Sequence, residues 1–432
     1  MTHAQWAFLL VPLSCCAGSG RDPAEVLKQV TAKVRARDAG LPNYTCVETV
    51  QREYYMPRGS TLPRACRTLM ELRGHRPFDL VLRHVMTDRL RLDVTMSDRG
   101  EIYSWVGASH FEDTTIDHLV RAGPINTGAF GGFLSVVFDK DVQQFRFERN
   151  VTVDGRSLME FSFDVPKEKS SYRVKAGNSF VRTAYSGTFQ ADPETSELVR
   201  MTVNSGELPL ATGTCQSSTA MEFALVQIGD GEFLLPKQGK QRYLGTAGEE
   251  VENTTTFAGC REYKGESTVT FFPPPEPANG MGTSGVPGKA DPLPARLPFE
   301  FELSTPILLD RAAAGDAFSG RLVGALRDSR GTALAPAHAV VEGRLLRVQV
   351  LHGAREGAVL VLKLRTVEVR GVKIPLEAVR DWTQMRPEKG GSLPILLPQP
   401  GEENSGVFPL PGGRAGLKAG FRSQWITMGG AR

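Results

Sequence analysis

The sequence lacks any dense cluster of basic residues. Its 51 lysines and arginines are mixed along the chain with 48 aspartates and glutamates, which leaves a formal net charge of +3. Proteins that bind nucleic acids usually concentrate basic side chains on one face or in one run. The even mixture of charges therefore argues against nucleic acid as a partner.

Long apolar runs are also missing. Beyond the N-terminus, no segment approaches the roughly eighteen apolar residues that a transmembrane helix needs. The strongest run, Trp6 to Leu13, is short and is followed by small residues from Ser14 to Gly20 and then by charge. This order is typical of a secretory signal peptide over residues 1–20, so we expect an exported chain with no membrane span. Leu13-Ser14-Cys15-Cys16 also matches a lipobox, so lipidation of Cys16 is the alternative to ordinary cleavage.

Cysteine is scarce beyond the signal segment, where only Cys46, Cys66, Cys215 and Cys260 remain. None of them has the neighbouring ligand, two to four residues away, that zinc sites usually show. An even number of cysteines in an exported chain favours disulfides, for which three pairings are open. We expect the local pairing, Cys46 with Cys66 and Cys215 with Cys260, because it closes loops of modest length. Each bridge would then stabilise the fold by about 3–4 kcal/mol.

Recognisable catalytic motifs are absent as well. The chain has no Gly-x-Ser-x-Gly nucleophile elbow. Gly131-Gly132 lacks the lysine and the strand–loop–helix context of a phosphate cradle. Carboxylate pairs such as Glu249-Glu250 lie in turn-like segments, where solvation explains them. We therefore expect no catalytic residue, no cofactor and no enzymatic activity.

One polar cluster leaves a metal site open as an alternative. It consists of His110, Glu112, Asp113, Asp117 and His118. Imidazole and carboxylate groups are metal ligands, which makes His110 and His118 the candidates for a metal-dependent hydrolase. The acidic residues also suit a helix N-terminus electrostatically, with both histidines in solvent. We favour this second interpretation and expect no bound metal.

The patterns that are present predict a mainly β (α+β) fold. Asp22-Pro23 begins a helix that carries Val26, Leu27, Val30 and Val34 at helical spacing. Tyr44 to Tyr55 reads as a strand, and Cys66 to Leu72 as a second strand that the first disulfide would join to it. From Pro77 to Phe272 the hydrophobic pattern mostly repeats every second residue, which indicates short antiparallel strands separated by turns.

A helical segment interrupts this alternation. Five apolar residues fall on one helix face: Phe130, Phe133, Leu134, Val137 and Phe138. A shorter helix around Ile116, Leu119 and Val120 precedes them, so we expect an inserted helical hairpin. The five residues are our candidates for lining an apolar ligand cavity, and the alternative is that they only fill the core. Glycines before them (Gly123, Gly128, Gly131, Gly132) could let the helix move.

Composition divides the chain into two domains. The first spans residues 22–272, and a Pro/Gly-rich linker covers 273–298. A second β domain spans 299–386, and a Pro/Gly-rich tail, 387–432, closes with a strand or partner-facing segment that contains Trp425. The sequence thus predicts an antiparallel half-barrel with an N-terminal helix and an inserted helical hairpin, plus a second small β-barrel.

Three segments resemble known families. Gly187 to Met201, a strand, a turn at Asp192-Pro193-Glu194-Thr195 and a strand, resembles the hairpin of the lipoprotein-localisation carrier (LolA-like) superfamily. That resemblance implies a half-open β-barrel over Ala24 to Phe272 that wraps helices and shelters an acyl chain. Leu41 to Thr49 and Gly259 to Tyr263 look like blocks of an uncharacterised family of secreted bacterial proteins, with no activity to carry over.

The second domain is similar to the small barrel of TrbI-like conjugal-transfer proteins. The similarity rests on Ala314-Gly315-Asp316 and on Ala335 to Arg344. That family has glycine where this chain has His338. The resemblance implies architecture only, because a shared fold does not establish a function.

These observations favour an exported, non-catalytic envelope protein of the periplasm or outer envelope. We expect the half-barrel to bind an apolar ligand, either a lipid or a lipoprotein acyl chain, or a protein partner. An alternative is a structural module of an envelope complex, contacted through the second domain and Trp425. The metal-dependent hydrolase is the least favoured hypothesis.

Overall fold

The computed structural model describes residues 21–39, 44–58, 65–73, 82–97, 100–108, 111, 116–125, 127–142, 144–229, 231–262, 293–353, 356–381 and 398–429. The predicted signal peptide with Cys16, most of the predicted linker, and His110, Glu112 and Asp113 lie outside these residues. What was expected of them stays a prediction. No helix in the described part of the chain is long and apolar enough to cross a membrane.

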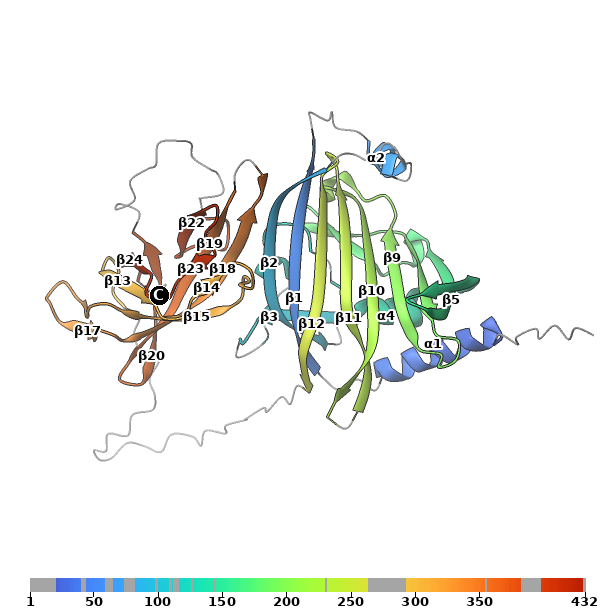
Figure 1. The fold of residues 1–432 in the computed structure, drawn as a ribbon, viewed down its shortest axis with the longest axis horizontal. Coiled ribbons are helices and arrows are strands. Elements are labelled where there is room, and N and C mark those ends of the chain that lie inside the picture. The colour runs from blue at the N-terminus through green and yellow to red at the C-terminus, as the bar shows by residue number, and fades with distance from the viewer. Residues whose placement is uncertain are drawn as a thin grey trace, which may run out of the picture.

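The first domain is a large antiparallel sheet with few helices, as the alternating pattern predicted (Figure 1). Its ten strands pair in the order β3-β2-β1-β12-β11-β10-β9-β8-β5-β4. Their bounds are β1 (Tyr44–Pro57), β2 (Leu82–Ser97), β3 (Gly100–Trp105), β4 (Arg146–Val153), β5 (Arg156–Val165), β8 (Tyr185–Ala191), β9 (Leu198–Ser205), β10 (Thr214–Ile228), β11 (Gly231–Gly245) and β12 (Glu250–Glu262). The sheet does not close, so the half-barrel is open. The hairpin predicted within Gly187 to Met201 is formed by β8 and β9.

Helix α1 (Pro23–Ala39) lies against this sheet, as its hydrophobic spacing predicted. The carboxylate of Asp22 accepts a hydrogen bond from the backbone N–H of Ala24, which satisfies one of the unpaired donors at the helix start. Val26, Val30 and Val34 are buried in one cluster with side chains of β5, β8, β9 and the inserted helix. Burial of this stripe is what holds a short helix in place.

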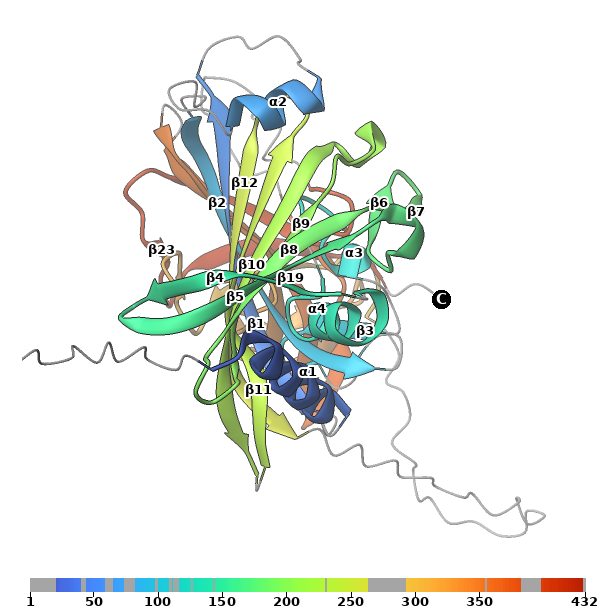
Figure 2. The same ribbon diagram turned by 90° about the vertical axis from the view of Figure 1, so that its right-hand side faces the viewer.

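The inserted segment is helical over most of the stretch that the sequence predicted, but Phe130 lies in the turn before the helix. It contains α3 (Ile116–Leu119) and α4 (Gly132–Ser135), and α4 continues as a π-helical turn over Val136–Asp141. Figure 2 shows α1 and α4 on the same side of the sheet. A small separate hairpin of β6 (Arg173–Ala176) and β7 (Ser179–Arg182) projects beside α3.

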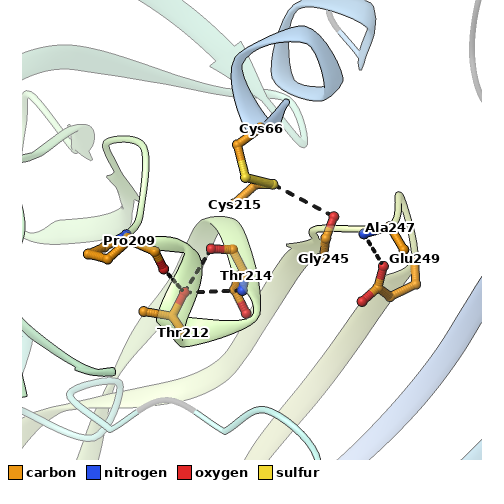
Figure 3. The surroundings of a disulfide bond; sticks show 8 residues. All are labelled: Cys66, Pro209, Thr212, Thr214, Cys215, Gly245, Ala247 and Glu249. Carbon is orange, nitrogen blue, oxygen red and sulfur yellow. Dashed lines mark hydrogen bonds between the residues drawn. A yellow bond between two sulfur atoms is a disulfide. The ribbon is translucent and has the colours of Figure 1, made fainter. Parts of the chain in front are cut away.

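The predicted disulfide pairing is wrong. Cys46 of β1 is bonded to Cys260 of β12, and Cys66 is bonded to Cys215 of β10. β1 and β12 come from opposite ends of the domain but pair side by side, with Thr45 opposite Arg261, so the register brings Cys46 to Cys260. The predicted strand at Cys66 is instead helix α2 (Cys66–Arg73), which packs on β10 (Figure 3).

The second domain has its own apolar core and mostly antiparallel strands. Its sheet runs in the order β21-β24-β13-β15-β18-β19-β22, with β20 also paired to β19. The bounds are β13 (Pro298–Leu303), β15 (Ala317–Leu322), β18 (Val340–Leu351), β19 (Gly357–Val369), β20 (Val372–Pro375), β21 (Ala378–Arg380), β22 (Gly406–Pro411) and β24 (Arg422–Thr427). Two small pairs complete it: β14 (Ile307–Leu308) with β23 (Gly416–Leu417), and β16 (Leu326–Arg327) with β17 (Ala333–Ala335).

The chain end belongs to this core rather than to a partner-facing tail. β24 pairs with β13 and β21, and the side chain of Trp425 is fully buried. Its indole N–H donates a hydrogen bond to Ser423. The predicted terminal strand is therefore present as β24, the alternative in which Trp425 faces a partner is wrong because its side chain is buried, and the second sheet extends beyond residue 386. His338 has a φ of 64°, a left-handed conformation in which the glycine of the TrbI-like pattern would be unstrained.

The two domains share a sheet and are not joined by the linker alone. β18 pairs with the first half of β2, with Gln349 opposite Asp88 (Figure 1). Arg91 forms an ion pair with Asp316 across the same junction. Gly315 packs so closely that a Cβ there would lie 2.2 Å from the Arg91 carbonyl oxygen. The Pro/Gly-rich composition predicted a flexible linker between two separate domains. The pairing of β18 with β2 was not predicted, because contact between strands so far apart in the chain leaves no local sequence pattern.

Candidate functional site

A cavity of about 500 Å³ opens in the first domain between the sheet, α3 and the β6–β7 hairpin. Three tyrosines from separate elements border it: Tyr103 of β3, Tyr172 before β6, and Tyr243 of β11. Apolar side chains add to the wall, namely Ile116, Val120, Ile125, Val174 and Leu208. The charged residues at its border are Glu101, Asp117, Arg121, Arg173 and Lys175. The wall is thus amphipathic.

Glu101 of β3 lines this cavity, and Glu48 of β1 interacts electrostatically with Glu101 and with the lining tyrosines Tyr103 and Tyr243 without lining the cavity itself. Glu48 of β1 is only 3% exposed, and its Oε2 has no hydrogen-bond partner among the described residues. Burial, with a further contribution from Glu101, raises the pKa of Glu48 well above its ordinary value. Glu48 therefore remains protonated at pH values where an exposed glutamate is ionised.

Burial also raises the pKa of the phenol groups of Tyr103 and Tyr243. For Tyr103 the second cause is Glu101, whose Oε2 accepts the phenol hydrogen bond at 2.6 Å. For Tyr243 the second cause is Tyr172. The Tyr243 hydroxyl donates to Gln241 at 3.2 Å. Both tyrosines therefore stay neutral and serve as hydrogen-bond donors within the wall.

Glu101 fixes the glycine-rich start of the inserted helix. Its carboxylate accepts hydrogen bonds from the backbone N–H groups of Phe130, Gly131 and Gly132, at 2.9, 2.9 and 3.2 Å, and also from Gly128. Gly128 has a φ of 106°, which only glycine adopts without strain. The amides of Gly131 and Gly132, which the sequence did not assign to a phosphate cradle, thus bind the chain's own carboxylate and tie the insertion to β3.

A buried ion pair holds a second point of the insertion, at Ala122. Arg52 of β1 and Asp88 of β2 face each other across the ladder and form two hydrogen bonds of 2.7 Å. Arg52 also donates to the carbonyl of Ala122, and Asn253 donates to the carbonyl of Pro124. The insertion is therefore anchored on the sheet at two points, Ala122 to Pro124 and Gly128 to Gly132.

The apolar helix face predicted from the sequence lies elsewhere. Phe130, Phe133, Leu134, Val137 and Phe138 are all buried, with exposed fractions of 7% or less. None of the five is among the residues that line this cavity. Phe133 packs edge-on against Tyr172, with ring centroids 5.5 Å apart, so it supports a lining residue from behind. Direct ligand contact by these five residues stays a prediction.

The metal candidates are not assembled into a site that the structure describes. His118 lies in α3 and borders a second cavity, of about 140 Å³, at the domain junction. Among the described residues, no group of three His, Cys, Asp or Glu side chains is placed to hold a metal ion. Asp117 forms an ion pair with Lys175 at the mouth of the larger cavity.

One signal in the sequence could have pointed to the cavity. Cys46, Glu48 and Val50 alternate onto one face of β1, so Glu48 is a charged residue in the apolar phase of a strand. Such a residue is either paired or functional, because burying a charge is costly. The tyrosines gave no comparable signal, since their convergence depends on pairing between strands far apart in the chain.

Comparisons with known proteins add little beyond these contacts. No family model and no curated protein sequence matches the chain. Solved structures with a similar fold include two that each cover a little over half of this chain. A DUF1329 family protein from Desulfovibrio piger ATCC 29098 has 10% identity and a TM-score of 0.28, covering 57% of this chain and 96% of that one.

The other is a putative outer membrane lipoprotein-sorting protein domain from Vibrio parahaemolyticus, with 11% identity and a TM-score of 0.26. The match covers 56% of this chain and 94% of that one. It is of the class that Gly187 to Met201 resembles. Structural similarities this weak do not indicate a function.

Proposed function

We propose that the first domain is a non-catalytic binding module for an amphiphile with an apolar chain and an anionic head, such as a fatty acid or lipid. The observation that carries the proposal is the cavity of about 500 Å³, a volume typical of small-molecule sites. Its apolar wall residues and tyrosine rings suit the chain. Arg121 and Arg173 at its border suit a carboxylate or phosphate head.

Binding without chemistry is supported by how the polar groups are used. Glu101 is occupied by backbone amides and by Tyr103, and Lys175 is paired with Asp117. A general acid or base needs its reactive atom free to reach a substrate. These groups instead hold the wall in shape, which is the role expected in a carrier or a receptor.

We further propose that this binding occurs in an oxidising compartment, with the periplasm as the best candidate. Two disulfides, Cys46–Cys260 and Cys66–Cys215, support the compartment, because such bonds persist where thiols are not kept reduced. Anchoring through a lipid on Cys16 is a separate prediction. Intact mass measurement of protein from the membrane fraction tests it directly.

The proposal is tested by displacement of a fluorescent fatty acid from the purified protein. We expect saturable binding that Val174→Trp abolishes, because Val174 lines the cavity and the indole would fill it. Val372→Trp is the control, since Val372 is an exposed valine of β20 in the second domain and does not line the cavity. Absence of saturable binding to the folded wild type, or equal binding by both variants, would refute the proposal.

A further inference from the structure

The mouth of the cavity carries exposed apolar side chains beside basic ones. Phe180 of β7 is 55% exposed and borders the cavity. Leu210 is 72% exposed and begins a short helical turn, Leu210–Thr212, that contacts β6. Around them lie three exposed cations of the hairpin: Arg173, Lys175 and Arg182. We call these five residues the lip.

The register of the hairpin gathers the lip residues. Arg173 pairs with Arg182, and Lys175 pairs with Phe180, so the four side chains share one face of the two strands. Figure 2 shows this hairpin standing apart from the large sheet, at the right of the view. Leu208 and Thr212, on either side of Leu210, both line the cavity, so the turn belongs to the same mouth.

The exposed leucine is held on a braced turn. The Thr212 hydroxyl donates to the Pro209 carbonyl at 2.8 Å and accepts from the Thr214 amide at 3.1 Å (Figure 3). The Cys66–Cys215 disulfide ties the next residue along to α2. The fold therefore holds Leu210 in an exposed position. Burying this side chain against another surface would be favourable, because it removes apolar area from water.

We propose that the lip docks onto an anionic lipid surface and sets the cavity mouth against it. Apolar side chains ringed by lysine and arginine bind the boundary of a bilayer, where the cations meet the phosphate groups. Lys175 is paired with Asp117, and Glu207 is exposed nearby in the chain. The three cations outnumber these two carboxylates, and the cavity border adds one further cation, Arg121, and one further carboxylate, Glu101, which backbone amides hold.

A second exposed phenylalanine shows what distinguishes the lip. Phe147 of β4 is 41% exposed and also has arginines nearby. There, however, Arg146 is paired with Asp164 at 2.9 Å and Arg149 with Glu160 at 3.0 Å. That patch is electrically balanced, so it should not favour an anionic surface. Phe147 therefore supplies the matched control.

The inference rests on the proposed function, because the membrane would be the source or the destination of the amphiphile. The test is flotation of the full chain with phosphatidylcholine vesicles and with vesicles that also contain phosphatidylglycerol. We expect binding only to the second kind, and weaker binding as salt rises. The double variant Phe180→Ala/Leu210→Ala should lower the partition coefficient about tenfold, and Phe147→Ala should leave it unchanged.

A charge variant tests the other half of the interaction. Arg173→Gln/Arg182→Gln should lower partitioning about fivefold for each cation removed. Failure of the wild type to float, or equal loss in Phe147→Ala, would overturn the docking. So would dimerisation of the wild type that Phe180→Ala abolishes, if vesicle binding is absent, because the lip would then be a contact between two copies.

Displacement of the fluorescent fatty acid in vesicle-free buffer separates the two proposals. Fatty-acid binding without flotation refutes the docking and keeps the binding module. Flotation without fatty-acid binding refutes the binding module, and the docking then stands as adhesion only. The single substitutions Leu210→Ala and Arg182→Gln should leave binding of the soluble fatty acid unchanged, because these two lip residues do not line the cavity.

Discussion

The two ends of the first domain's inner sheet face differ in chemistry. Toward β5 and β8 the face is built from phenylalanine, with Phe138, Phe161 and Phe189 packed at ring distances of about 5 Å under α1. Toward β1, β3 and β11 the same face carries Glu48, Tyr103 and Tyr243, and it borders a cavity. We call the first the phenylalanine end and the second the mixed end. Side chains fill the phenylalanine end, and the cavity lies at the mixed end, where polar and apolar side chains occur together.

The largest expected effect comes from the phenylalanine end. Phe138→Ala should destabilise the protein by about 3–5 kcal/mol, because it removes a side chain that is 1% exposed from a packed cluster. Fatty-acid affinity per folded molecule should not change. Chemical denaturation combined with displacement titration measures both quantities, and a large loss of affinity would mean that this end holds the ligand.

A smaller effect is expected where the mixed end is tied to the insertion. Glu101→Gln should cost about 2–3 kcal/mol, because the carboxylate accepts several backbone hydrogen bonds and the amide would replace a charged acceptor by a neutral one. Here the affinity should fall together with the stability. A variant with normal affinity would show that the insertion does not shape the cavity.

The buried carboxyl of Glu48 should make stability depend on pH. Its pKa is raised in the folded protein, so the folded state binds more protons than the unfolded state above the ordinary glutamate pKa. Stability should therefore fall as pH rises from about 5 toward 8. Glu48→Gln should remove this slope, with a gain on the order of 1 kcal/mol at the alkaline end. Parallel denaturation curves at the two pH values provide the check, and an unchanged slope would contradict it.

The smallest effect is expected at the domain junction. The rings of His84 and His352 lie 4.1 Å apart, and both bond to the Thr87 hydroxyl. Burial and then His84 lower the pKa of His352, while Glu53 and Glu356 oppose the shift. The contribution of His352 is thus present above the ordinary histidine pKa and lost as pH falls through its lowered value. We expect an acid destabilisation of a few tenths of a kcal/mol that His352→Gln abolishes. Melting curves between pH 5 and 7.5 would show it.

The sequence predicted the parts of the fold that depend on neighbours in the chain. The capped helix at Pro23, the strand from Tyr44 and the buried helix face from Phe133 to Phe138 all follow from local spacing, whereas Phe130 lies in the turn before the helix and packs in another cluster. Cys66 was assigned to the wrong element, because its segment is short and its helix is defined by packing on β10. The wrong disulfide partners had a separate cause, namely the preference for pairings that close loops of modest length.

Long-range pairing explains the rest of what was missed. Cys46 meets Cys260 only because the first and last strands of the domain are neighbours. The same closure of distant strands brings Tyr103, Tyr172 and Tyr243 to one cavity. Five apolar residues at helical spacing were the strongest local signal, and they became core. Apolar spacing reports burial, whereas an open cavity is defined by side chains from several elements.

One measurement tests the central claim most directly. The purified protein is loaded with a diazirine-labelled fatty acid, irradiated, digested and mapped by peptide mass spectrometry. We expect adducts at the mixed end, on peptides that contain Tyr172 to Val174 or Ile125. Adducts confined to the segment from Phe133 to Phe138 would place the ligand at the phenylalanine end and contradict the account.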